Sequence, residues 1–116
     1  GVAADELERR ARAAFLDELA TGLEAYEDAR LLLESVLAEG RPVGVGSNSA
    51  RWRLDAVLTA AGVRDRFRAS VAGDEVANPK PAPDVYARVV ASLGVAPAAC
   101  VVIEDSPTGI AAAAAA

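Results

Sequence analysis

The sequence predicts an α/β fold in which helices flank a Rossmann-like parallel sheet, and three observations carry this prediction. Short apolar runs alternate along the chain with longer segments whose apolar residues recur at helical spacing. Strands that alternate with helices are typical of parallel sheets, because each parallel strand needs a crossover connection. The apolar runs end in small polar or acidic residues, and the length of 116 residues allows one modest core.

Two helices are expected before the first strand. In residues 3–21, apolar side chains recur every fourth position, and a glycine interrupts the pattern at position 22. Residues 28–39 carry a second apolar stripe and are also followed by a glycine, a common helix stop. We interpret both stripes as plain core packing.

The later elements are expected to alternate between strand and helix. Ser49 and Asp84 precede helical patterns, and both residue types are good N-caps. A final helix is expected over the terminal alanines, since alanine is the best helix former. The expected order is strand 42–47, helix 50–61, strand 69–72, loop 73–78, helix 85–93, strand 100–103 and a last helix.

Charge and composition exclude several kinds of binding partner and of catalytic chemistry for this protein. The formal net charge of -5 argues against electrostatic binding to nucleic acid or to an anionic membrane surface. No apolar run reaches the roughly 18 residues of a membrane helix. Histidine is absent, which removes histidine bases and histidine metal ligands. Cys100 is the single cysteine, so a disulfide within the chain is excluded and a reducing, cytoplasmic setting is favoured.

The apolar run 100–103 leads directly into two carboxylates, Glu104 and Asp105. We expect the run to be a strand buried on both faces, because continuous apolar runs are typical of parallel strands covered by helices. Ligands of open α/β sheets sit outside the carboxyl ends of the strands. Two carboxylates there form a hard-oxygen site that suits Mg²⁺. The alternative is that they belong to a solvated turn at the start of the next helix.

Two other polar stretches carry groups that suit a phosphate. Ser47 and Asn48 end the strand 42–47 and precede a helix N-terminus, where N–H groups and the helix dipole favour an anion. The alternative is that they only cap that helix. Lys80 lies in a loop with three prolines in five residues, which keep the backbone extended and present the amine at a defined place. The alternative is an ordinary solvated lysine.

These three polar stretches are expected to converge at one edge of the sheet, because right-handed crossovers bring the carboxyl ends of parallel strands together. Hydroxyl and amide donors, one cation and two carboxylates together fit a phosphoryl group in transfer. The metal neutralises charge, the lysine clamps phosphoryl oxygens, and the hydroxyl and amide donors fix orientation.

The same stretches resemble motifs of the haloacid dehalogenase (HAD) superfamily, in its phosphatase and β-phosphoglucomutase-like branch. Ser47-Asn48 after an apolar strand resembles the second motif of that family. Residues 80–86 resemble the Lys-Pro-x-Pro-Asp-x-Tyr segment that carries the third-motif lysine, and residues 102–110 resemble the fourth, metal-binding motif. The order of the motifs matches, and the resemblance covers about residues 24–116.

The resemblance implies a role for each candidate residue. Ser47 would hydrogen-bond the transferring phosphoryl group, with Asn48 lining the site. Lys80 would pair with that phosphoryl group and with the nucleophile. Asp105 would bind Mg²⁺, and Glu104 would do so directly or through water. The acidic pattern is unlike that of true 2-haloacid dehalogenases, which favours a member that handles phosphate.

One part of the family pattern is absent from this sequence. The nucleophile of the family is the first Asp of an Asp-x-Asp motif, and no two aspartates here are two positions apart. Residues 1–24 resemble the end of a helical cap domain, and residues 25–116 resemble a partial HAD-like α/β core. The implied activity of an intact parent protein is that of a Mg²⁺-dependent phosphatase, which acts on a small phosphorylated metabolite through an aspartyl-phosphate intermediate.

Two alternatives stay open at this point. The first is a sugar-phosphate mutase of the β-phosphoglucomutase type. The second is a catalytically incomplete fragment or binding module. Because covalent catalysis needs the missing carboxylate, we expect the 116-residue chain alone to be inactive.

Overall fold

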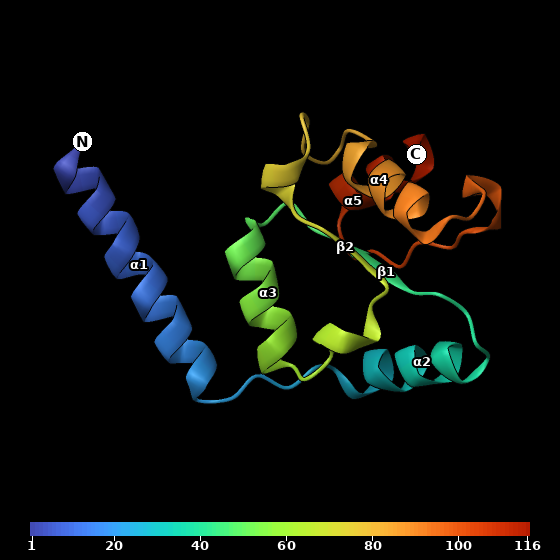
Figure 1. Cartoon of the computed structure of the whole chain (residues 1–116), viewed down its shortest axis with the longest axis horizontal. Helices are drawn as coiled ribbons and strands as arrows, with labels where there is room; N and C mark the ends of the chain where they lie inside the picture. Colours follow the sequence, from blue (N-terminus) through green and yellow to red (C-terminus); the bar gives the residue numbers. More distant parts are fainter.

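The structure, a computed structural model, describes residues 1–116 as five α-helices around a small parallel sheet (Figure 1). The elements confirm the predicted α/β class. None of the helices is both long and apolar enough to cross a membrane. The α-helices are α1 (Val2–Ala20), α2 (Glu27–Ala38), α3 (Arg51–Ala60), α4 (Asp84–Leu93) and α5 (Pro107–Ala115). The strands are β1 (Gly44–Gly46) and β2 (Ala69–Val71), and short 3-10 turns are η1 (Arg64–Arg66), η2 (Gly73–Glu75) and η3 (Pro97–Ala99).

One face of the sheet packs against α4. The parallel register pairs the two glycines of β1 with Ala69 and Val71 of β2. Ala69 and Val71 form a core cluster with Val85 and Val89 of α4. A methyl group on the β1 glycines would lie 2.4 Å from a Val89 methyl or 2.5 Å from a Val85 methyl. The glycines therefore allow α4 to approach β1 closely, as expected for glycine inside a strand.

The other face of the sheet packs against α3, so the two helices lie on opposite sides of the strands (Figure 1). Leu54 and Leu58 of α3 are buried in a second cluster with Ala72, and Val45 of β1 packs against it. Ser70, the register partner of Val45, directs its hydroxyl to Arg51 in the first turn of α3. The alternation of side chains along each strand thus separates an apolar α4 face from a partly polar α3 face.

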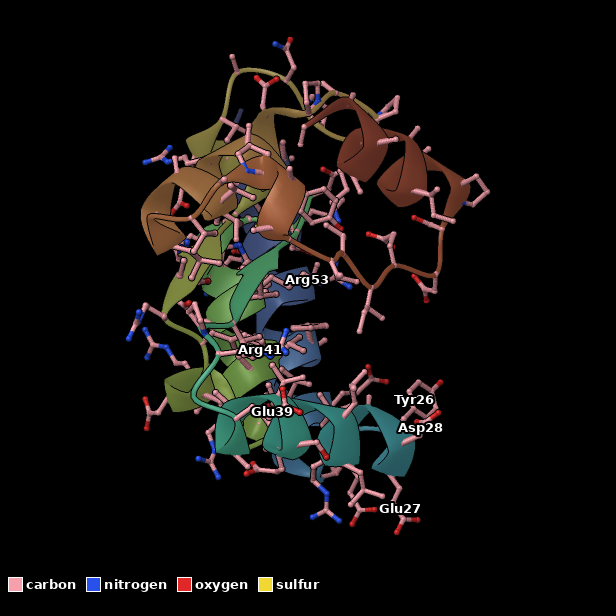
Figure 2. The ribbon with its side chains drawn as sticks, turned by 90° about the vertical axis from the view of Figure 1, so that its right-hand side faces the viewer. Tyr26, Glu27, Asp28, Glu39, Arg41 and Arg53 are labelled. Atoms are coloured by element: carbon pink, nitrogen blue, oxygen red, sulfur yellow. The ribbon has the colours of Figure 1, made fainter.

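The helices α1 and α2 contribute no buried residue, which corrects the expectation that their apolar stripes pack in the core. Phe15 of α1 lies edge-on to Trp52 of α3, with ring centroids 5.7 Å apart. The N-terminal end of α2, with Tyr26, Glu27 and Asp28, points away from the strands (Figure 2). A helical stripe identifies the apolar face of a helix, but it does not establish that a second layer covers that face.

The run 100–103 is not a strand, so this prediction was wrong. Val101 is 91% exposed and Ile103 is 74% exposed. Among the backbone amides of the run, only that of Cys100 donates a hydrogen bond, to the carbonyl of Pro97. A strand requires a neighbour to complete its hydrogen bonds, and no element of this chain pairs with the run.

Two predicted helix caps are also corrected. The α3 helix is preceded by Ala50 rather than capped by Ser49, and Asp74 from η2 accepts a hydrogen bond from the Arg51 amide instead. Asp84 is the first residue of α4 itself, and its carboxylate accepts hydrogen bonds from Asn78. At α3 a partner 23 residues away thus replaces the local cap, whereas α4 begins after Pro83 without a side-chain cap. The last helix forms as expected and includes most of the alanine run.

Candidate active site

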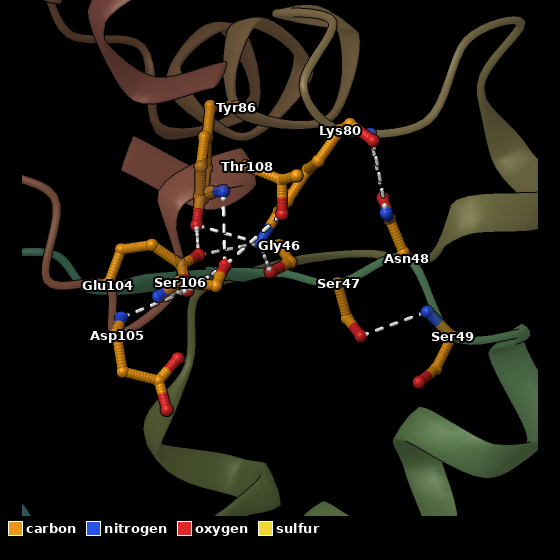
Figure 3. A network of polar contacts seen from close by, with 11 residues as sticks. Gly46, Ser47, Asn48, Ser49, Lys80, Tyr86, Glu104, Asp105, Ser106 and Thr108 are labelled. Carbon is orange, nitrogen blue, oxygen red and sulfur yellow. Dashed lines mark hydrogen bonds and ion pairs between the residues drawn. The ribbon is translucent and has the colours of Figure 1, made fainter. Parts of the chain in front are cut away.

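The amine of Lys80 lies at the centre of a polar network that joins separate parts of the chain (Figure 3). It donates to the carbonyl of Gly46 at 3.1 Å, at the end of β1, and to the hydroxyl of Tyr86 at 2.7 Å. It also forms an ion pair with Glu104 at 2.9 Å. The side chains of Lys80 and Glu104 are only 11% and 12% exposed. Two of the predicted site residues, 24 positions apart, are therefore in direct contact.

Tyr86 is a member of this network that sequence reasoning missed. The motif resemblance of residues 80–86 includes this tyrosine but implies no role for its hydroxyl, and the residue is buried in α4. Its hydroxyl accepts from Lys80 and donates to Glu104, and the Lys80 amine lies 4.4 Å from the ring centroid. The available signal was the hydroxyl itself, because a buried phenol normally requires a hydrogen-bond partner.

The carboxylate of Glu104 is held by five donors. One oxygen accepts from Lys80 and Tyr86, and the other accepts from the amides of Asp105 and Ser106 and from the Ser106 hydroxyl. A methyl group added at Gly109 would lie 2.0 Å from the Glu104 carboxyl carbon. The absence of a side chain at Gly109 thus leaves the space that the carboxylate occupies.

The two polar residues that follow β1, Ser47 and Asn48, make different contacts. The Asn48 side chain accepts from the Lys80 amide at 2.9 Å and donates to the Lys80 carbonyl at 3.5 Å. The Ser47 hydroxyl accepts from the Ser49 amide at 3.0 Å. Asn48 therefore holds the backbone of Lys80, while the Ser47 hydroxyl keeps its own proton available as a donor.

Asp105 is the second carboxylate at this end of the sheet. Its side chain is exposed and accepts no hydrogen bond from the protein. No group of three or more His, Cys, Asp and Glu side chains is gathered here. Mg²⁺ commonly takes one or two protein carboxylates and completes its shell with waters and phosphate. The donor set of Asp105 and Glu104 fits that requirement, with Asp105 the carboxylate whose oxygens are free of protein partners.

The stretch 104–109 is also a helix start, as the alternative interpretation predicted. Ser106 precedes α5, and its hydroxyl accepts from the Gly109 amide at 3.1 Å. The same hydroxyl donates to Glu104. Ser106 therefore ties the cap of α5 to the position of the carboxylate, so the capping and site interpretations are compatible.

Comparison with known proteins identifies the family. Residues 2–116 match the haloacid dehalogenase-like hydrolases. The chain belongs to this family. It is 45% identical over 76 residues to the fructose-1-phosphate phosphatase YqaB of Escherichia coli, covering 66% of this chain and 40% of that protein. It is 38% identical over 95 residues to a β-phosphoglucomutase of Mycobacterium bovis, covering 78% of this chain and 36% of that protein.

A solved HAD-like structure agrees with the fold. The crystal structure of CbbY from Rhodobacter sphaeroides in complex with phosphate superposes with a TM-score of 0.86 and 28% identity. The match covers 96% of this chain and 51% of that one. The chain thus spans about half of the solved relative and a smaller share of the two curated relatives.

The polar network of this HAD-like chain fixes the charge of its members. Hydrogen bonds from Tyr86 and then Lys80 hold the pKa of Glu104 well below its usual value, so the carboxylate is ionised. Burial lowers the pKa of Lys80, but bonds to Tyr86 and Glu104 outweigh it and leave that pKa raised. Burial and the bond to Glu104 raise the pKa of the Tyr86 phenol, which stays protonated. The site therefore holds a lysine cation beside a carboxylate anion near neutral pH.

Proposed function

We propose that the parent protein containing this region is a Mg²⁺-dependent phosphatase that acts on a small phosphorylated metabolite. The observation that carries the proposal is the contact of the Lys80 amine with both the end of β1 and Glu104. This contact joins the end of β1, the loop of Lys80 and the acidic stretch at Glu104, which are the three parts of the chain that resemble family motifs. A relative named as a fructose-1-phosphate phosphatase and a CbbY structure that contains phosphate support the reaction class.

In this proposal the residues of the network bind and orient the phosphoryl group. The Ser47 hydroxyl donates to a phosphoryl oxygen, and Lys80 supplies positive charge to the oxygens on which charge develops. Asn48 lines the site and acts mainly through the backbone of Lys80, to which it is bonded. The cation of Lys80 is kept in place by Glu104 and Tyr86 before substrate arrives.

The two proposed metal ligands, Asp105 and Glu104, differ in whether their carboxylate oxygens are free to bind an ion. Asp105 presents free carboxylate oxygens and is assigned as the direct ligand of Mg²⁺. Glu104 already accepts five hydrogen bonds, so we assign its contact with the ion to a bridging water. When bound, Mg²⁺ neutralises charge on the phosphoryl group.

The covalent step needs a group outside residues 1–116. We propose that an Asp-x-Asp motif elsewhere in the parent protein supplies the nucleophile that forms the aspartyl-phosphate intermediate. We also propose that residues 1–24 belong to a helical cap and residues 25–116 to the α/β core. The location of α1, which contacts α3 through Phe15 and Trp52 but buries nothing in the core, supports this division.

The test is phosphate release by the purified parent protein from a panel of sugar and polyol phosphates, with Mg²⁺ and with EDTA. We expect release that depends on Mg²⁺ and falls by several orders of magnitude in Asp105→Asn and in Lys80→Ala. Arg68→Ala, an exposed residue outside the network, is the control and should keep full activity. Activity that survives both site changes would overturn the assignment of the site.

A sugar-phosphate mutase is the second candidate, because a β-phosphoglucomutase is among the relatives. The two activities differ in product: a phosphatase releases inorganic phosphate, whereas a mutase converts one sugar phosphate into its isomer. Phosphorus NMR of the same reaction mixtures separates them. Purified residues 1–116 serve as a further comparison, and we expect no turnover from them; turnover would show that the missing carboxylate is not required.

A further inference from the structure

A second polar network lies next to the candidate site and is centred on Arg51 in the first turn of α3. The guanidinium donates two hydrogen bonds to the carboxylate of Glu75, at 2.7 and 2.8 Å. It also donates to Asp55 at 3.1 Å and to the hydroxyl and carbonyl of Ser70 at 2.8 and 2.7 Å. These contacts engage all five N–H donors of the side chain. One residue thus joins α3, β2 and η2.

The Arg51–Glu75 pair is geometrically the strongest ion pair outside the candidate site. A bidentate arginine–carboxylate pair is stronger and more directional than a single contact. The carboxylate of Glu75 also accepts from the amide of Ala72 at 3.0 Å. Both side chains are about 30% exposed, whereas the arginine of the surface pair Arg9–Glu6 on α1 is 75% exposed. The pair therefore fixes the shape of the 72–75 turn.

The 72–75 turn in turn holds the loop 47–49 that follows β1. The Gly73 amide donates to the carbonyl of Ser49 at 2.8 Å, and Asp74 accepts from the Arg51 amide at 3.0 Å. A methyl group on Gly73 would lie 2.1 Å from the carbonyl oxygen of Asn48. The two backbones are therefore in close contact, and a shift of the turn must shift the loop.

The position of the loop 47–49 in turn determines where the backbone of Lys80 lies. The side chain of Asn48 makes the hydrogen bonds of the Lys80 amide and carbonyl, and the Lys80 backbone has no other hydrogen-bond partner. Residues 78–83 form no regular helix or strand. The contact with Asn48 is thus the main anchor of the lysine backbone (Figure 3).

We propose that Arg51 and Glu75 are a positioning pair for the candidate active site. The pair fixes the 72–75 turn, the turn fixes the loop 47–49, and Asn48 of that loop holds Lys80 where its amine meets Glu104. Neither Arg51 nor Glu75 touches the Lys80 amine or either candidate metal ligand. The catalytic consequence of this inference rests on the proposed function, whereas the chain of contacts does not.

The direct test is amide hydrogen exchange measured by NMR on residues 1–116. Glu75→Gln and Arg51→Lys keep the approximate size of each side chain and remove the charged bidentate pair. We expect the amides of Gly73 and Lys80 to exchange on the order of tenfold faster relative to the amide of Val89, a core residue of α4. The control is Arg66→Lys, which alters an ion pair with Glu34 and should leave these ratios unchanged.

Selective exchange distinguishes positioning from general stability. A pair that only stabilised the fold would raise the exchange of all three amides by a similar factor, and that result would overturn the inference, as would no change. If Glu75→Gln fails to fold, Arg51→Lys still gives the test. Asn48→Ala removes the last link alone; it should release the amide of Lys80 and leave that of Gly73 protected.

The activity of the parent protein tests the catalytic consequence of the Arg51–Glu75 pair separately from amide exchange. We expect Glu75→Gln to lower kcat on the order of tenfold with little change in KM, because the position of the lysine matters most in the transition state. Selective exchange in the variants of a parent that releases no phosphate would refute the proposed function and leave the positioning pair intact. An active parent whose Gly73 and Lys80 amides are unaffected by both variants would refute the positioning pair alone.

Discussion

Replacement of Glu104 by glutamine tests the energetic role of the Lys80–Glu104 pair. The substitution keeps the shape of the side chain and removes its charge, leaving the cation of Lys80 without its partner at 11% exposure. Breaking a buried ion pair on one side costs about 3–5 kcal/mol, because the remaining charge is desolvated without compensation. The residual exposure and the other two partners of the amine favour the lower end. We therefore expect Glu104→Gln to lower the free energy of unfolding by about 3 kcal/mol.

Urea unfolding of residues 1–116 near neutral pH measures this change. The matched control is Glu39→Gln, because Glu39 pairs with Arg41 on the surface, where the side chains are 61% and 71% exposed (Figure 2). We expect that control to lie within about 0.5 kcal/mol of the wild type. A loss below about 1 kcal/mol for Glu104→Gln would refute the reasoning, since exposed pairs contribute no more than this.

Four further outcomes follow from the structure. Gly109→Ala, which helix propensity alone predicts to stabilise α5 by about 1 kcal/mol, should instead destabilise the chain, because its methyl group would lie 2.0 Å from the Glu104 carboxyl carbon; a gain in urea midpoint would contradict this. Gly46→Ala should cost about 1–3 kcal/mol by overpacking against Val85 of α4, and an unchanged thermal midpoint would count against that packing. Tyr86→Phe should raise the pKa of Glu104, since it removes the hydrogen bond that lowers it most; a carbon NMR titration with no upward shift would contradict the assignment. The bond to Arg51 holds the pKa of Glu75 at about 2 against 4.5 when unfolded, so its stabilisation is present above pH 4.5 and lost as pH falls toward 2. Glu75→Gln should flatten the pH dependence of unfolding in that interval, and an unaltered slope would show that Glu75 is not its source.

The helices were predictable from local pattern. Apolar spacing and following glycines placed α1, α2 and α3 within one residue of their observed ends. The same information did not establish what each helix packs against. The stripes of α1 and α2 are apolar, yet these helices bury no residue, because burial depends on which other parts of the chain surround them.

The run 100–103 shows the same limit for strands. Its apolar β-branched residues have high strand propensity. A strand is nevertheless defined by hydrogen bonds with a neighbour, and no neighbour for this run is present among residues 1–116. Local sequence therefore identified a segment suited to a sheet but not the pairing that makes it one.

The candidate site was predictable where topology alone brings residues together. Lys80 and Glu104 were expected at one edge of the sheet, and their side chains meet there. Tyr86 was missed because its position on the helix is also that of a core residue, and only the folded structure shows where its hydroxyl points. Asp74 replaced Ser49 at the start of α3 for a related reason, since a cap supplied from 23 residues away leaves no local signal.

The central claim is that three stretches of the chain, those of Ser47, Lys80 and Asp105, form one site for a metal-bound phosphoryl group. A crystal structure of the intact parent protein with Mg²⁺ and inorganic phosphate tests it most directly. We predict the ion within about 2.1 Å of an Asp105 oxygen, and phosphate within hydrogen-bond distance of the Ser47 hydroxyl and the Lys80 amine. Phosphate bound elsewhere, or Mg²⁺ held by carboxylates that do not include Asp105, would contradict the account.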